Sequence, residues 1–290
     1  MIIQTKKATK YYGKIRGITD LDLSVEEGDF FGFIGPNGSG KSTTIRLLLG
    51  LISATSGEVE VFGKPVSVTA REALRDIGYM PSEAVFYGGM KVKDVLKLSA
   101  DLRKTDCFEE AKKLCDRLEL DVDKRINQLS LGNRKKVGIV CALQHRPKLY
   151  ILDEPTSGLD PLMQHEFFSL LKERNEEGAT VFLSSHILSE VGKYCKNAAV
   201  IREGKIIVSD SVDKLGHTGV KQITLKGGQN IPQLDGIRNV TKENESVSFL
   251  YSGDCKMLLN SLSDIDFKDI CITDPDLDQV FMHYYERGGK

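Results

Sequence analysis

Residues Gly35-Pro36-Asn37-Gly38-Ser39-Gly40-Lys41-Ser42 match the pattern G-x-x-x-x-G-K-[S/T] of a phosphate-binding loop. The residues before it, Phe30–Gly35, predict a strand, and those from Lys41 to about Leu49 predict a helix that Gly50 closes. The glycines let backbone N–H groups converge on phosphate oxygens, and the helix N-terminus adds the positive end of its dipole. An ordinary glycine-rich turn is the alternative, and the strand–helix context argues against it.

The residues of this loop are suited to separate tasks. We expect Lys41 to reach the β- and γ-phosphates of a nucleotide from an exposed loop, and the Ser42 hydroxyl to bind Mg²⁺. The residues expected to contact the nucleotide are Gly35, Pro36, Asn37, Gly38, Ser39, Gly40, Lys41, Ser42 and Thr43.

A second candidate site follows the apolar run Leu149–Leu152, which predicts a buried strand ending in two carboxylates. Asp153, at the end of the strand, is placed to hold Mg²⁺ through a water molecule. Glu154 is then the candidate for polarising an attacking water. An acidic loop after a core strand is the structural alternative, which the phosphate loop elsewhere in the chain makes less favourable.

The composition narrows the class of protein. The chain has 290 residues, with 40 Lys and Arg against 41 Asp and Glu and a formal net charge of −1. Because this balance gives no bulk attraction for nucleic acid or an anionic membrane, we expect no nucleic-acid partner. No run approaches the roughly 18 apolar residues of a membrane-spanning helix, and the first residues lack a secretory signal. The six cysteines include no Cys-x-x-Cys pair, so we expect neither a zinc site nor disulfides. This cysteine pattern is typical of a protein in a reducing compartment.

Short apolar strands alternate with helical periods along the chain, which predicts an α/β layered fold. Thr180–Leu183 is typical of a buried parallel strand, and residues 198–208 are typical of a hairpin with a glycine turn. Between about Val92 and Leu120 the pattern is helical. One face is expected to carry Val92, Val95, Leu96, Ser99 and Leu102, and the next to carry Phe108, Ala111, Leu114, Cys115 and Leu118.

The stretch Gly216-His217-Thr218-Gly219 predicts a boundary between a domain of residues 1–216 and a small α+β domain of residues 217–290. A domain of about 70 residues is only marginally stable alone. Its expected strands are Val220–Lys226, Ser246–Tyr251 and Asp269–Thr273, and its expected helices are Cys255–Leu262 and Pro275–Tyr285.

The order of further motifs makes the sequence similar to a known family. After the phosphate loop come the stretches Leu129–Asn133, Asp153–Thr156, Ser157–Asp160 and Ser184–His186. Over residues 2–215, this order resembles the ATP-binding subunit of ABC (ATP-binding cassette) transporters. The stretch Pro275–Tyr285 resembles the tail of bacterial exporter-type members, which work with a separate membrane permease.

This resemblance implies a P-loop NTPase (ABC ATPase) core with a helical subdomain at about residues 84–145, and ATP and Mg²⁺ as cofactors. It implies that Tyr12 stacks on adenine; Tyr11 is the neighbouring candidate, and a strand-edge aromatic is the structural alternative. It also implies that Ser130 and Gly132 contact the γ-phosphate of ATP held by the opposite subunit of a head-to-tail dimer. The remaining implied roles are coupling of the two sites by Asp160 and a hydrogen bond to the γ-phosphate from His186.

The chain departs from the family pattern at two places. Leu131 stands where the third signature residue is usually Gly, and Asn133 stands where the fifth is usually Gln. The leucine adds bulk beside the partner's nucleotide, so we expect altered contacts there. Ser82 stands where a Gln usually follows Gly-Tyr-apolar-Pro, and its side chain is too short to reach as far as that amide. Glu83 is a candidate metal or permease contact, and the alternative is that the loop acts only mechanically.

The expected function is an ATPase that couples hydrolysis to transport, with export as the expected direction. Its expected partners are integral membrane permease subunits and a second ATP-binding subunit, identical or different. It would lie in the cytoplasm, at the inner face of the cell membrane. The alternative is a soluble ABC-type ATPase in translation or DNA repair; such relatives usually carry two cassettes, a coiled-coil insert or zinc-binding cysteines, which this sequence lacks. A phosphate-loop kinase or GTPase would lack Leu129–Asn133 and show a guanine-reading Asn-Lys-x-Asp, also absent here.

Overall fold

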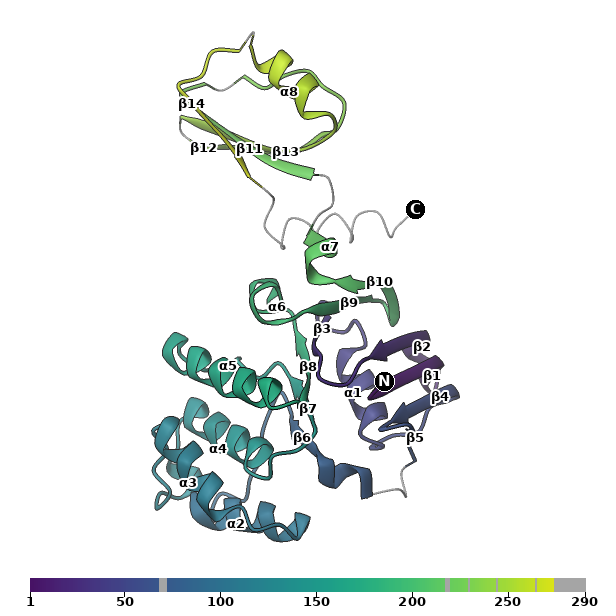
Figure 1. The fold of residues 1–290 in the computed structure, drawn as a ribbon, viewed down its shortest axis with the longest axis vertical. Helices are drawn as coiled ribbons and strands as arrows, with labels where there is room; N and C mark the ends of the chain where they lie inside the picture. The colour runs from purple at the N-terminus through teal and green to yellow at the C-terminus, as the bar shows by residue number, and fades with distance from the viewer. Residues whose placement is uncertain (68–71, 217–219, 229, 244, 264, 274–290) are drawn as a thin grey trace. The chain divides into compact units, whose positions relative to one another are not determined.

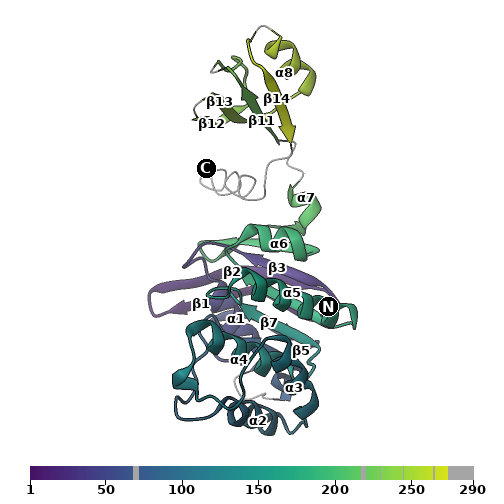
Figure 2. The ribbon, with the colours of Figure 1, turned by 90° about the vertical axis from the view of Figure 1, so that its left-hand side faces the viewer.

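The computed structural model describes residues 1–67, 72–216, 220–228, 230–243, 245–263 and 265–273. The chain divides into two compact units, Met1–Ser209 and Asp210–Lys290, which are described in turn (Figures 1 and 2). The predicted boundary after residue 216 lies somewhat later, at the end of the short helix α7 (Val212–Gly216).

A six-stranded sheet forms the centre of the first unit, with the strand order β10-β9-β3-β8-β7-β6. Its strands are β3 (Phe30–Ile34), β6 (Ile77–Met80), β7 (Leu149–Asp153), β8 (Thr180–Ser185), β9 (Asn197–Arg202) and β10 (Lys205–Ser211). β3 runs parallel to β8 and β9, and β7 runs parallel to β6 and β8. Every residue of β3, β7 and β8 is buried, which confirms the prediction of buried parallel strands. The carboxyl ends of these three strands therefore meet at one edge, where parallel sheets bind ligands.

A second, antiparallel sheet of the same unit has the order β2-β1-β4-β5. Its strands are β1 (Ile3–Tyr12), β2 (Ile15–Val25), β4 (Ser56–Val61) and β5 (Lys64–Pro65). Helix α1 (Lys41–Leu48) contacts β2 and β4 of this sheet and β7 of the central one (Figure 1). Ile45 of α1 is fully buried in one core with Leu21 of β2 and Ile151 of β7. The helix that follows the phosphate loop is thus fixed between two sheets.

Helices α2 (Val92–Arg103), α3 (Phe108–Arg117) and α4 (Leu131–Leu143) form a helical group in which α4 packs on α2, α3 and β6. The other helical segments of this unit are α5 (Pro161–Glu176), α6 (Leu188–Tyr194) and the 3-10 turns Glu72–Asp76 and Ile126–Gln128. Within the described ranges, no helix is long and apolar enough to cross a bilayer.

Two apolar residues of the expected helical faces are not buried: Leu102 and Phe108 are 73% and 71% exposed. The buried stripe of α2 runs through Val92, Leu96 and Ala100, at a spacing of four residues, and leaves Leu102 in the last turn outside it. Phe108 is the first residue of α3 and lines a hollow of about 1010 Å³ between α2 and α3 instead of entering the core.

The second unit is built on a four-stranded antiparallel sheet with the order β12-β13-β11-β14. Besides α7, its elements are β11 (Val220–Lys226), β12 (Ile237–Glu243), β13 (Ser246–Ser252), α8 (Cys255–Leu262) and β14 (Asp269–Thr273). Ile223 and Phe249 pair across β11 and β13 and share a core with Leu258 of α8. Strand β12 was not predicted, because its polar, exposed residues lack apolar alternation. The predicted helix at Pro275–Tyr285 lies outside the described residues.

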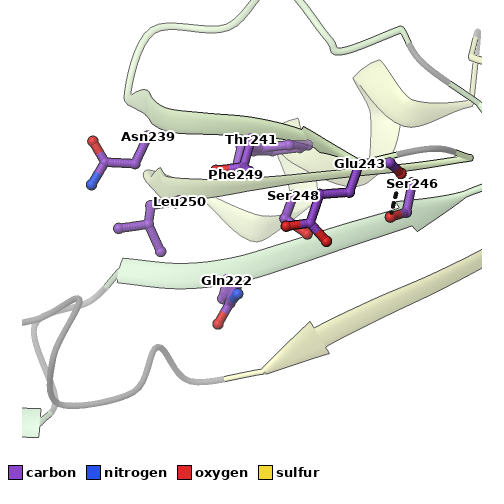
Figure 3. A pocket seen from close by; sticks show the side chains of 8 residues that line it. All are labelled: Gln222, Asn239, Thr241, Glu243, Ser246, Ser248, Phe249 and Leu250. Atoms are coloured by element: carbon purple, nitrogen blue, oxygen red, sulfur yellow. Dashed lines mark hydrogen bonds between the residues drawn. The ribbon is translucent and has the colours of Figure 1, made fainter.

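Polar side chains of this sheet surround a hollow of about 370 Å³ (Figure 3). It is lined by Gln222, Asn239, Thr241, Glu243, Ser246, Ser248, Phe249 and Leu250. Because side chains alternate along a strand, Gln222 and Ser248 project away from the face on which Ile223 packs against α8. None of the residues that the sequence assigns to nucleotide binding lies in this unit.

We predict that a chain ending at Gly216 still folds and binds ATP, because every phosphate-handling motif precedes that residue. Equilibrium titration with a fluorescent ATP analogue, compared with the 290-residue chain, measures this. A shortened chain that unfolds cooperatively but no longer binds ATP would place part of the site in the second unit. Reduced solubility alone would reflect newly exposed apolar surface.

Candidate functional site

The loop between β3 and α1 has a backbone that admits little besides glycine at two positions. A side chain at Gly35 would collide with the carbonyl of Ile201, and Gly40 has a φ of +113°. No side chain in the described part of the chain caps α1, so its first N–H groups are available to an anion. The buried hydroxyl of Ser39 likewise has no hydrogen-bond partner among the described residues. These features fit a bound phosphate chain.

Lys41 is only 5% exposed, so the expectation of an exposed loop side chain is wrong. The loop folds over its own lysine: Nζ donates to the carbonyl of Gly35 at 2.6 Å and to that of Pro36 at 3.2 Å. Nζ also lies 3.4 Å from Oε1 of Glu154. The ammonium is thus held in place by two carbonyls of the loop and by the carboxylate of Glu154.

Asp153 joins the end of β7 to the phosphate loop. Its Oδ2 accepts a hydrogen bond from the Ser42 hydroxyl at 2.9 Å, and its Oδ1 accepts one from the Ser184 hydroxyl at 3.1 Å. A hydroxyl beside one carboxylate fits Mg²⁺, which commonly takes one or two carboxylates and completes its shell with water and substrate phosphates. The described residues contain no group of three or more His, Cys, Asp or Glu side chains that could hold a metal ion.

Glu154 brings a second carboxylate to the same edge. Its φ of +48° is in the left-handed region, and its N–H donates to the carbonyl of Ser184 at 2.9 Å. Oε1 lies 3.3 Å from Nδ1 of His186 and 3.4 Å from Nζ of Lys41. The structure therefore gathers Lys41, Ser42, Asp153, Glu154 and His186, which come from three separate stretches of the chain.

Burial changes the acidity of two neighbours of this group. Burial, together with the negative charge of Asp153, raises the pKa of Tyr79. Burial lowers the pKa of Lys135, although the charges of Glu154, Asp153 and Glu83 oppose this. The charge of Asp153 acts on Tyr79, and the charges of both Asp153 and Glu154 act on Lys135.

Lys135 and Ser184 are site residues that sequence reasoning missed. Lys135 Nζ donates to the backbone carbonyls of Ser82 and Glu154. The available signal was its position in α4, four residues before the buried Ile139 and therefore on the same face of the helix. Ser184 belongs to the stretch Ser184-Ser185-His186, in which the family resemblance assigns a role only to His186.

The geometry favours Tyr12 over Tyr11 as the aromatic neighbour of the loop. The ring of Tyr12 and the methyl group of Thr43 both lie close to Gly17, at 3.1 and 3.0 Å from the position that a Cβ would occupy there. The N–H of Tyr11 instead donates to the hydroxyl of Thr55. Stacking of Tyr12 on adenine remains a prediction.

The signature residues lie together on a different stretch. The Ser130 hydroxyl accepts from Asn133 N and so caps α4, and the side chain of Leu131 is 64% exposed beside Gly158. Gly132 faces the carbonyl of Gly158. In the described residues, no hydrogen bond or ion pair joins this group to the phosphate loop.

Asp160 is exposed, and its side chain has a local partner. Its Oδ1 accepts a hydrogen bond from Met163 N, so that it caps α5. This contact accounts for a structural role of Asp160, and its coupling role across a dimer stays a prediction.

Comparison with known proteins identifies the family of this chain. The family model described as "ABC transporter" matches residues 18–157. The bacitracin transport ATP-binding protein BcrA of Bacillus licheniformis is 40% identical over 221 residues, covering 74% of this chain and 71% of that protein. The linearmycin resistance ATP-binding protein LnrL of Bacillus subtilis is 31% identical, covering 78% and 74%.

A solved structure of an ATP-binding subunit of an ABC transporter matches with a TM-score of 0.71 and 28% identity. The match covers 74% of this chain and 92% of that one. The fold is thus that of a P-loop NTPase of the ABC ATPase type. The chain belongs to the ABC transporter family, and within it to the ATP-binding subunits.

We predict that Lys41→Ala weakens the binding of ATP–Mg²⁺ about 10- to 100-fold, because hydrogen bonds to charged groups contribute about 1.5–3 kcal/mol. Since Lys41 is buried against two loop carbonyls, the melting temperature should also fall slightly. Titration with a fluorescent nucleotide and thermal unfolding measure the two effects. Lys172→Ala, on the exposed face of α5, is the control; wild-type affinity in Lys41→Ala would refute the assignment of the loop.

Proposed function

We propose that the chain is the ATP-hydrolysing subunit of an exporter, coupling hydrolysis of ATP–Mg²⁺ to transport through a separate membrane permease. The observation that carries the proposal is the meeting of Lys41, Glu154 and His186 at the sheet edge, beside the Ser42–Asp153 hydrogen bond. This edge provides phosphate binding, metal ligands and a carboxylate base within one site.

The proposed roles follow from the positions of the side chains. The loop from Gly35 to Thr43 holds the phosphates through backbone N–H groups and Lys41, and Tyr12 stacks on the base. Ser42 and Asp153 would hold Mg²⁺, which offsets the negative charge of the phosphates. Glu154 accepts the proton of the attacking water, and His186 donates a hydrogen bond to the γ-phosphate.

The proposed active form is a head-to-tail dimer of ATP-binding subunits, identical or different. Ser130 and Gly132 of each subunit would contact the ATP of the other, with the N-terminus of α4 directed at the anion. The exposed Leu131 would lie at this contact and modify it. Asp160 would communicate between the two sites.

Two observations support a membrane partner. The relatives named above are a bacitracin transport protein and a linearmycin resistance protein. In this chain, Val85 and Tyr87 are 88% and 77% exposed in the segment between β6 and α2. An exposed apolar pair in the loop that follows Ser82 fits a protein contact. We therefore propose that the permease binds there and that the chain lies at the cytoplasmic face of the membrane, without a role in nucleic-acid binding.

We predict that Glu154→Gln keeps ATP binding and lowers turnover about 10²–10⁴-fold, because Gln keeps the size but cannot accept the water's proton. A dimer with two bound ATP molecules should then accumulate. Single-turnover hydrolysis measures the loss of turnover, and size-exclusion chromatography with ATP and Mg²⁺ measures the shift from monomer to dimer. If Leu131 weakens the dimer of the isolated chain, the shift should return when the permease is present.

Glu176→Gln is the matched control, since it makes the same change on the exposed face of α5. It should hydrolyse ATP at the parental rate. If Glu154→Gln does so too, Glu154 is not the catalytic carboxylate, and Glu83 becomes the next candidate.

We also predict that the chain, isolated from its own cells in mild detergent, co-purifies with an integral membrane protein that lacks a cassette of its own. Changing both Val85 and Tyr87 to Ser should reduce this association, while ATP binding by the purified chain stays unchanged. Association with ribosomes or repair complexes instead would favour a soluble ABC-type ATPase.

A further inference from the structure

Lys135 is a buried lysine whose partners are backbone carbonyls. Its side chain is 4% exposed, in the second turn of α4, and Nζ donates to the carbonyl of Ser82 at 2.7 Å and to that of Glu154 at 3.0 Å. Lysine is rarely buried without a paired charge. Among the described residues, however, no carboxylate lies within 4.0 Å of this ammonium.

The two carbonyls belong to the ends of neighbouring strands. In the parallel pair β6 and β7, Met80 lies opposite Leu152. Ser82 comes two residues after Met80, and Glu154 comes two residues after Leu152. Their carbonyls therefore lie next to each other at the same edge of the sheet. Lys135 therefore joins three segments at one point: α4, the loop after β6 and the acidic end of β7.

The contact falls on a backbone conformation that needs support. Glu154 has a φ of +48°, which is unfavourable for a residue with a Cβ and persists only where surrounding contacts fix it. The N–H of Glu154 donates a hydrogen bond to the carbonyl of Ser184, and the carbonyl of Glu154 accepts one from Lys135. The peptide groups on both sides of Glu154 are thus fixed, which sets the direction of its carboxylate toward Lys41 and His186.

We infer that Lys135 is a positioning residue for ATP hydrolysis: its ammonium holds the backbone of Glu154 and the Ser82–Glu83 loop in one arrangement. The inference rests on the proposed role of Glu154. Because the link uses the backbone carbonyl of Ser82, it does not depend on the short side chain at that position. The same ammonium connects the exposed loop to the backbone of Glu154.

The test compares Lys135→Met and Lys135→Arg in the full chain, with ATP–Mg²⁺ as substrate. Lys135→Met keeps a side chain of similar length but removes both hydrogen bonds. It should lower kcat about 10²-fold, because small misplacements of catalytic groups have effects of this size. KM and ATP affinity should stay within about twofold, since the loop residues are untouched. Lys135→Arg keeps donors for both carbonyls and should recover most of kcat.

Lys136→Met is the matched control. Lys136 is the next residue of α4 and is 9% exposed, and in the described chain it makes no hydrogen bond to either strand end. It should keep the parental kcat. Should Lys135→Met lose its cooperative melting transition, Lys135→Gln, with a shorter neutral donor, is measured in its place with the same expected direction.

A double variant separates positioning from a general effect on the fold. If Lys135 acts through Glu154, adding Lys135→Met to Glu154→Gln should cause no further loss in single-turnover hydrolysis. The inference is overturned if Lys135→Met keeps kcat, if ATP affinity falls as much as kcat, or if the two losses multiply. Failure of the proposed function would show separately, as parental hydrolysis by Glu154→Gln alone.

Discussion

The register of the central parallel sheet is the constraint on which the whole site depends. β8 lies between β3, which leads into the phosphate loop, and β7, which carries the acidic pair. Ile34 lies opposite Ser185, and Asp153 lies opposite Ser184, so the three strands end at one level. A slip of β7 by one residue would turn Asp153 to the other face and break its hydrogen bonds with Ser42 and Ser184.

Burial of charge at this edge is the second constraint. Lys41 and Asp153 are almost fully buried, a costly condition unless partners replace the lost water. The carbonyls of Gly35 and Pro36 do so for Lys41, and two hydroxyls do so for Asp153. The charges that the proposed chemistry needs are therefore held in place by the folded chain itself.

The sequence predicted the elements that have strong local patterns. The strands β3, β7 and β8 are short apolar runs, and α1 follows a glycine-rich loop. Prediction failed where burial depends on distant packing: Leu102 and Phe108 lie on the expected helical faces but are 73% and 71% exposed. The sequence also did not predict β12, a polar edge strand that is defined by its pairing with β13.

The phosphate loop, the acidic pair after β7 and the order of the family motifs can be identified from the sequence alone, because each is a continuous stretch with its own backbone requirements. Which side chains meet depends on the tertiary structure. Ser42 reaches Asp153 across 111 positions, and Lys135 reaches Ser82 across 53. Periodicity reports neighbours within one helix or strand, whereas these contacts follow from strand order, register and the packing of α4. The burial of Lys41 and the support of Glu154 by Lys135 became visible only there.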